Sequence, residues 1–170
     1  MNRAALLALA VLFCVCGGAV ALATAGLATP PVEQPIAFNH LRHAKRDIAC
    51  ADCHQGVETS AFACLPRVSL CMDCHGEDTD TTPEKDRMKA YAAAKTEIPW
   101  VRLYRLPAHV VFSHERHVAL GKVRCDACHG SHGESERPPE RPVSATLRMR
   151  RCLSCHAEKG ASVDCVACHK

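Results

Sequence analysis

The sequence predicts a mostly irregular fold with short α-helices, arranged in two related halves. The first observation behind this prediction is the pattern Cys-x-x-Cys-His, which occurs five times in 170 residues. The second is the composition, because aromatic residues make up only 4% of the chain and ten of its 13 cysteines lie in the five motifs. So short a chain with so few large apolar side chains cannot build a conventional core.

The five motifs have the sequence to which c-type haem is attached. Two cysteines three positions apart lie on one face of a helical turn, where both thiols can bond the vinyl groups of one porphyrin. The next residue, histidine, then lies under the iron as its proximal ligand. We therefore predict a multihaem cytochrome c with five haem c groups, which form its core. The attachment residues are Cys50, Cys53, Cys71, Cys74, Cys125, Cys128, Cys152, Cys155, Cys165 and Cys168. The proximal ligands are His54, His75, His129, His156 and His169.

A second pattern, Phe-x-His-x-Arg-His, precedes the first motif at residues 38–43 and the third motif at residues 112–117. The repeat divides the chain into two related halves, residues 36–98 and 110–170. Two histidines three positions apart on a helical turn diverge, so they can serve two different irons. A second histidine is the usual axial ligand of a low-spin haem. We predict that the distal ligands include His40, His43, His114 and His117.

Five irons need a fifth distal ligand, and three residues compete for that position. Met149 lies three residues before Cys152, and a thioether ligand would raise the potential of that haem. His132 follows the third motif closely and could reach a neighbouring haem, while His109 lies between the two halves. The remaining possibility is that the fifth iron has no distal ligand from the protein. We predict Met149, with His132 as the alternative.

The N-terminal residues read as an export segment. Residues 4–28 carry no charge behind Arg3, and this run of about 25 apolar residues is long enough to span a bilayer. Small residues at 21–25 also offer cleavage sites for a signal peptidase. Covalent haem attachment takes place outside the cytoplasm, so an export signal is required. We predict a membrane anchor or signal peptide at 1–28, a Pro-rich spacer at 29–35 and a pentahaem domain at 36–170.

Three further features carry expectations. Thr82 and Pro83 predict the N-cap and first residue of an exposed helix over residues 83–95, with Met88 and Tyr91 facing inward. Cys64 is the single cysteine of the predicted domain outside a motif, and we interpret it as a structural free thiol. The net charge of +3 counts amino-acid side chains only and does not include the propionates of bound haems. We expect lysine and arginine side chains to pair with those propionates rather than with nucleic acid.

These patterns resemble the multihaem class III cytochromes c, which share Phe-x-His-x-x-His followed by Cys-x-x-Cys-His. Further segments resemble the pentahaem cytochrome subunit of alternative complex III and the related subunit of periplasmic quinone reductase complexes. These segments are Gln34-Pro35-Ile36, Ser60-Ala61-Phe62, Cys71-Met72-x-Cys74-His75, Trp100-Val101-Arg102, Leu106-Pro107, Cys128-His129-Gly130 and Leu147-x-Met149-x-x-Cys152-Leu153.

The resemblance implies an electron carrier without a catalytic residue or a small-molecule substrate of its own. It implies a periplasm-facing subunit of a membrane quinol or quinone oxidoreductase, held to the bacterial inner membrane by its N-terminus. The expected partners are iron-sulfur and quinone-binding membrane subunits. The resemblance also favours Met149, which falls on the family's methionine before the fourth motif. The alternatives are a free shuttle in the soluble periplasm and a multihaem reductase with one open haem.

Overall fold

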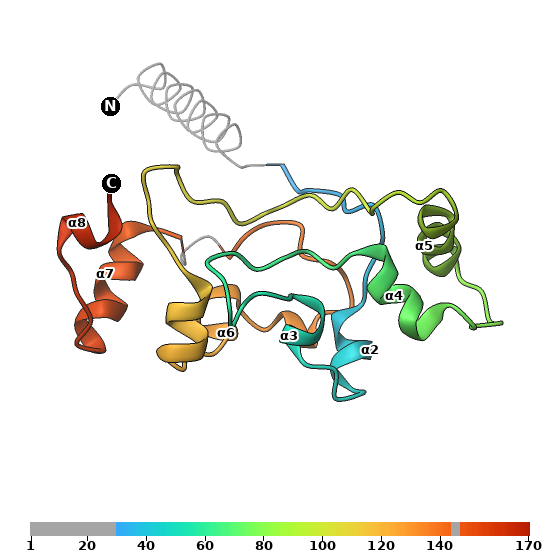
Figure 1. Ribbon diagram of the computed structural model, residues 1–170, viewed down its shortest axis with the longest axis horizontal. Coiled ribbons are helices and arrows are strands. Elements are labelled where there is room, and N and C mark those ends of the chain that lie inside the picture. The colour runs from blue at the N-terminus through green and yellow to red at the C-terminus, as the bar shows by residue number, and fades with distance from the viewer. Residues whose placement is uncertain (1–29, 144–146) are drawn as a thin grey trace, which may run out of the picture. The chain divides into compact units, whose positions relative to one another are not determined.

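The computed structural model describes residues 30–143 and 147–170 as short helices joined by irregular segments (Figure 1). The described residues contain no strand, and their one isolated antiparallel bridge joins Val110 to His169. This confirms the predicted fold class. The helices are α2 (His40–Ala44), α3 (Cys50–Cys53), α4 (Val68–His75), α5 (Pro83–Ala93), the π-helix η1 (Arg116–Leu120), α6 (Asp126–His129), the 3-10 helix η2 (His132–Glu134), α7 (Met149–Glu158) and α8 (Cys165–Cys168).

Contacts divide the chain into two units, Met1–Pro31 and Val32–Lys170. The predicted anchor or signal peptide lies outside the described residues, and none of the helices within them is long and apolar enough to cross a membrane. The predicted spacer at 29–35 overlaps the second unit, because Val32 donates its backbone N–H to Glu140 O at 2.8 Å. Gln34 also exchanges two hydrogen bonds with the backbone of Val101, at 2.9 and 3.0 Å.

The apolar core formed by the polypeptide is small. Among the described residues, the buried hydrophobic side chains are Ile36, Val68, Met88 and Ile98. Trp100 packs against this cluster, and its indole N–H donates to Pro66 O at 3.2 Å. Four buried side chains are too few for a domain of this length, which fits the prediction that bound porphyrins supply most of the core.

The predicted helix over residues 83–95 is present as α5, which begins at Pro83 as expected and ends two residues early, at Ala93. The Thr82 hydroxyl caps it by accepting the backbone N–H of Lys85 at 3.2 Å, and Pro83 occupies its first turn. Met88 is buried and Tyr91 packs against the same cluster. Helix α5 therefore packs on α4, which carries the second motif.

The two Phe-x-His-x-Arg-His segments adopt the same local geometry. Phe38 stacks on His43 with ring centroids 4.4 Å apart and planes at 26°, and Phe112 stacks on His117 at 4.4 Å and 25°. Each phenylalanine also meets the first histidine of its segment edge-on, at 4.7 and 4.9 Å. The repeat seen in the sequence is thus a repeat of side-chain packing.

The two halves differ by one residue between the second histidine and the next motif. The structure accommodates this residue in η1, a π-helix that ends at Leu120 and has Gly121 as its C-cap. A π-helix turn holds one residue more than an α-helical turn, and such turns are frequent at functional sites. The insertion is therefore absorbed after His117, and the packing of Phe112 on both histidines is kept.

Candidate functional site

Each of the five motifs lies on a turn of helix. Helices α3, α6 and α8 are single turns made of motif residues, whereas α4 and α7 extend further. All eleven cysteines within the described residues are free of disulfides. Burial is the largest cause that raises the pKa of the thiols of Cys53, Cys71, Cys125 and Cys128. Paired cysteines on one helical face are what attachment of a porphyrin requires.

Four of the five motif histidines face another histidine across a short gap. The centroid separations are 6.2 Å for His43 and His75, 6.3 Å for His114 and His129, 6.0 Å for His117 and His156, and 5.4 Å for His109 and His169. In each of these pairs one ring comes from a motif, and the other comes from outside any motif. Each pair thus brings a histidine from outside the motifs within 5.4–6.3 Å of a motif histidine, measured between ring centroids.

Hydrogen bonds at Nδ1 orient most of these rings. Backbone carbonyl oxygens contact the Nδ1 atoms of five histidines at 2.7–3.1 Å. The pairs are His43 with Asn39, His54 with Cys64, His114 with Ala61, His117 with Ser113, and His156 with Ser162. A carbonyl can only accept, so Nδ1 carries the proton and Nε2 presents a lone pair. This is the state in which histidine binds a metal.

The first motif histidine, His54, lies in a cluster with His40. Burial is the largest cause that lowers the pKa of His40 to about 4, followed by the charges of His54, His132 and His43. The buried Nδ1 of His40 has no hydrogen-bond partner within the described part of the chain. In the second half, the equivalent His114 faces the equivalent motif residue His129. The repeat therefore matches His40 with His54.

His132 also approaches His40, with ring centroids 6.2 Å apart. Its Nε2, however, contacts the hydroxyl of Tyr104 at 3.3 Å. The backbone N–H of Val143 donates to that same hydroxyl oxygen at 3.1 Å, so the hydroxyl proton is free to bond His132. The nitrogen that a metal would use is thus already engaged by Tyr104.

His109 and His169 are held together by the backbone as well as by their rings, whose planes differ by 22°. The N–H of Lys170 donates to His109 O at 3.1 Å, and the N–H of Val111 donates to Cys168 O at 2.8 Å. Met149, by contrast, begins α7 and is 56% exposed. Of the candidates for the fifth distal position, His109 is the one whose ring faces an unmatched motif histidine.

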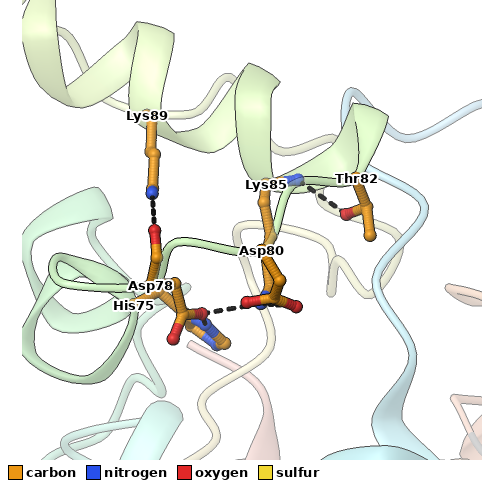
Figure 2. Close-up of polar contacts among 6 residues, drawn as sticks. All are labelled: His75, Asp78, Asp80, Thr82, Lys85 and Lys89. Carbon is orange, nitrogen blue, oxygen red and sulfur yellow. Dashed lines mark hydrogen bonds and ion pairs between the residues drawn. The ribbon is translucent and has the colours of Figure 1, made fainter.

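His75 differs from the other histidines because its Nδ1 bonds a carboxylate, Asp78 Oδ2, at 2.6 Å (Figure 2). The same oxygen forms an ion pair with Lys85 Nζ at 2.7 Å. Lys85 also contacts both carboxylate oxygens of Asp80 at 2.8 Å. The hydrogen bond from Lys85 is the largest cause that lowers the pKa of Asp78 to about 2, and the bond from His75 is the next.

Electrostatic contacts between cysteines show which motifs are neighbours. The charge of Cys53 contributes to the raised pKa of Cys71, and the charge of Cys74 contributes to the raised pKa of Cys53. The first and second motifs are therefore neighbours. A hydrogen bond with Cys50 contributes to the raised pKa of Cys125, so the first and third motifs are also neighbours. The charges of Cys155 and Cys152 contribute to the raised pKa of Cys128, so the third and fourth motifs are neighbours as well. The helices α4, α3, α6, α7 and α8 follow in that order from right to left in Figure 1.

These observations fit c-type haem. The thiol pairs would hold the porphyrins, and the facing imidazoles would supply both axial ligands. Sequence reasoning missed Asp78, although a carboxylate three residues after a motif histidine is a readable signal. It also ranked His109 below Met149 and His132, because pairing across the bridge at His169 leaves no local pattern. The predicted ligand assignments themselves stay predictions.

Comparison with protein families gives two matches. Residues 42–139 match the cytochrome c3 family, and residues 110–170 match the family of cytochrome c7 and related cytochromes c. A comparison with curated proteins gives no match. Both matched families are multihaem class III-type cytochromes that bind c-type haem and carry electrons. Since the first match covers more than half of the residues, the chain belongs to the cytochrome c3 family.

Proposed function

We propose that the chain carries five c-type haems, each with two axial ligands from the protein, and that it conducts electrons between redox partners. The observation that carries this proposal is the set of facing imidazole rings. When bound, haem iron supplies reversible one-electron chemistry, with a potential that its axial ligands and surroundings set. The protein's part is to attach, orient and space the five groups.

The ring separations have the size that one iron between two imidazoles demands. A histidine nitrogen binds a transition metal at about 2.0 Å, and the ring centroid lies about 1.1 Å behind it, so opposed rings are about 6.2 Å apart. The pairs of His75, His129 and His156 lie at 6.0–6.3 Å. The pair of His169 is closer, at 5.4 Å, and its rings must separate slightly to admit an iron.

For the fifth distal position we propose His109, in place of the Met149 that the sequence favours. The support is the stacked contact of His109 with His169 and the two backbone hydrogen bonds that tie their segments together. His40 is then assigned to His54, as the repeat indicates. His132 is left outside the ligand set because its Nε2 is engaged by Tyr104.

The contacts between motifs support a linear order of attachment sites. This order is the second motif, the first, the third and the fourth, from the neighbouring cysteines of each pair. The fifth motif follows the fourth, because only the segment 157–164 separates His156 from Cys165. The second and fifth motifs are then the two ends, where electrons enter and leave.

We further propose that the chain is the periplasm-facing subunit of a membrane quinol or quinone oxidoreductase, on the outer side of the bacterial inner membrane. The uncharged run at 4–28 and the resemblance over residues 34–169 support this assignment. Iron-sulfur and quinone-binding membrane subunits would be its partners.

Two measurements test the haem proposal and the location separately. Mass spectrometry of the purified holoprotein should give five haems, and the Cys165→Ser/Cys168→Ser variant should give four. A holoprotein with four haems before mutation would overturn the assignment of five sites. Fractionation without detergent should leave the protein with the membrane, together with copurifying subunits. Recovery wholly in the soluble periplasmic fraction would favour a free shuttle instead.

A further inference from the structure

Six of the described histidines form a hydrogen bond at Nδ1, and they fall into two classes by the group that accepts the proton. Five of the described rings contact a neutral backbone carbonyl, at 2.7–3.1 Å. His75 alone among the described histidines contacts a carboxylate, and its distance to Asp78 Oδ2, 2.6 Å, is the shortest of the set. A charge-assisted bond of this length is stronger than one to a neutral acceptor.

We propose that Asp78 is a positioning and tuning residue that makes the haem site of the second motif the most reducing of the five. This inference rests on the proposed haem at Cys71 and Cys74 with His75 as its ligand. A carboxylate at Nδ1 draws the proton away from the ring and makes Nε2 a more basic ligand. A more basic ligand favours the ferric over the ferrous iron, because ferric iron carries the greater positive charge. The reduction potential of that site is therefore lowered relative to sites with carbonyl acceptors.

The surrounding residues keep this carboxylate in place and limit its effect. Lys85 forms an ion pair with the same oxygen that His75 bonds, at 2.7 Å, so it competes for the electron density of Asp78 (Figure 2). Asp80 contacts Lys85 through both carboxylate oxygens, and no hydrogen bond joins it to His75 among the described residues. Asp80 therefore offers a carboxylate of the same charge close by, without the bond to the ligand.

The loop that carries Asp78 is also held by two contacts that do not use the Asp78 side chain. Lys89 Nζ donates to the backbone oxygen of Asp78 at 2.6 Å, and the Thr82 hydroxyl caps α5 at the end of the same loop. Replacement of the Asp78 carboxylate by an amide leaves both contacts intact. A change at the haem site in such a variant would then report the acceptor and not a displaced loop.

The position of this site in the series gives the tuning a role. The second motif is one end of the proposed order of sites. A strongly reducing site at an end favours electron flow away from that end towards the other sites. The surface near α4 and α5 is then where a low-potential donor delivers electrons, and the region of the fifth motif is where they leave.

The test is a redox titration of the holoprotein and of three variants, followed by visible spectroscopy and EPR. Asp78→Asn and Asp80→Asn remove the same charge, and Lys85→Gln removes the cation between them. In Asp78→Asn, the lowest of the five midpoint potentials should rise by about 59 mV, which is a tenfold change in the one-electron equilibrium constant. The EPR signal of one low-spin ferric haem should change with it. In Asp80→Asn, the same potential should move much less. In Lys85→Gln, it should fall, because the competing cation is lost.

Equal shifts in Asp78→Asn and Asp80→Asn would overturn the proposal, since they would indicate charge at a distance and not the bond to His75. An unchanged set of potentials in Asp78→Asn would overturn it as well. Peptide mass spectrometry distinguishes failure of the tuning proposal from failure of the proposed haem at the second motif. A peptide with Cys71 and Cys74 that carries no haem would refute the proposed function at this motif, whatever the potentials show.

Discussion

The substitution His109→Ala separates His109 from Met149 as the fifth distal ligand. The ring centroids of His109 and His169 lie 5.4 Å apart, and His109 is one of the ten proposed axial ligands, which this substitution removes. One iron of five should then lose its sixth ligand, and about one fifth of the ferric haem should convert from low-spin to high-spin. The backbone contacts should survive the change, because they use His109 O and the backbone of Val111.

The assay is EPR of the ferric holoprotein with cyanide titration, alongside haem mass spectrometry to show that five groups remain attached. His109→Ala should bind one equivalent of cyanide, and added imidazole should restore the low-spin signal. Met149→Ala is the matched control and should keep the spectrum of the parent protein, because Met149 is exposed at the start of α7. A high-spin signal in Met149→Ala, with a silent His109→Ala, would refute the assignment of His109.

Three further predictions concern residues outside the ligand set. Met88→Ala should lower the free energy of unfolding by about 2–5 kcal/mol, because Met88 is one of four buried hydrophobic side chains described. Guanidinium titration followed by circular dichroism measures this loss. A loss below about 1 kcal/mol would contradict a stabilising role for this small core. Gly56→Ala should destabilise by about 1–3 kcal/mol in the same titration, since φ is +88° and the new Cβ would lie 2.8 Å from Phe62 O; an unaltered midpoint would show that the turn can relax. Cys64→Ala should keep five haems and an unchanged visible spectrum, because His54 bonds the backbone oxygen of Cys64 and not its thiol; loss of a haem would reveal a role for that thiol.

The local part of the site was readable from the sequence. Attachment of a haem uses residues within one helical turn, so the pattern Cys-x-x-Cys-His is enough to predict both thiols and the proximal histidine. The same holds for α5, where Thr82 and Pro83 mark the start and Met88 marks the buried face. The Phe-x-His-x-Arg-His repeat was also visible in the sequence, and the structure adds that Phe38 and Phe112 pack on the histidines in the same way.

The distal pairing was not readable in this way, because it joins segments that are far apart in the chain. His109 precedes His169 by sixty positions, and the bridge between Val110 and His169 is what brings them together. The order of the motifs differs from their order in the sequence for the same reason. The first motif neighbours both the second and the third, which only the contacts of Cys50 and Cys53 reveal.

The sequence by itself thus determined the chemistry of attachment, the family and the division into halves, since each depends on residues within a few positions of one another. Only the tertiary structure decided which imidazole lies opposite four of the five motif histidines and which group accepts the Nδ1 proton of three of them. The contact between His75 and Asp78 illustrates the difference. The two residues are three positions apart, yet their bond depends on a loop that Lys85 and Lys89 hold from another helix.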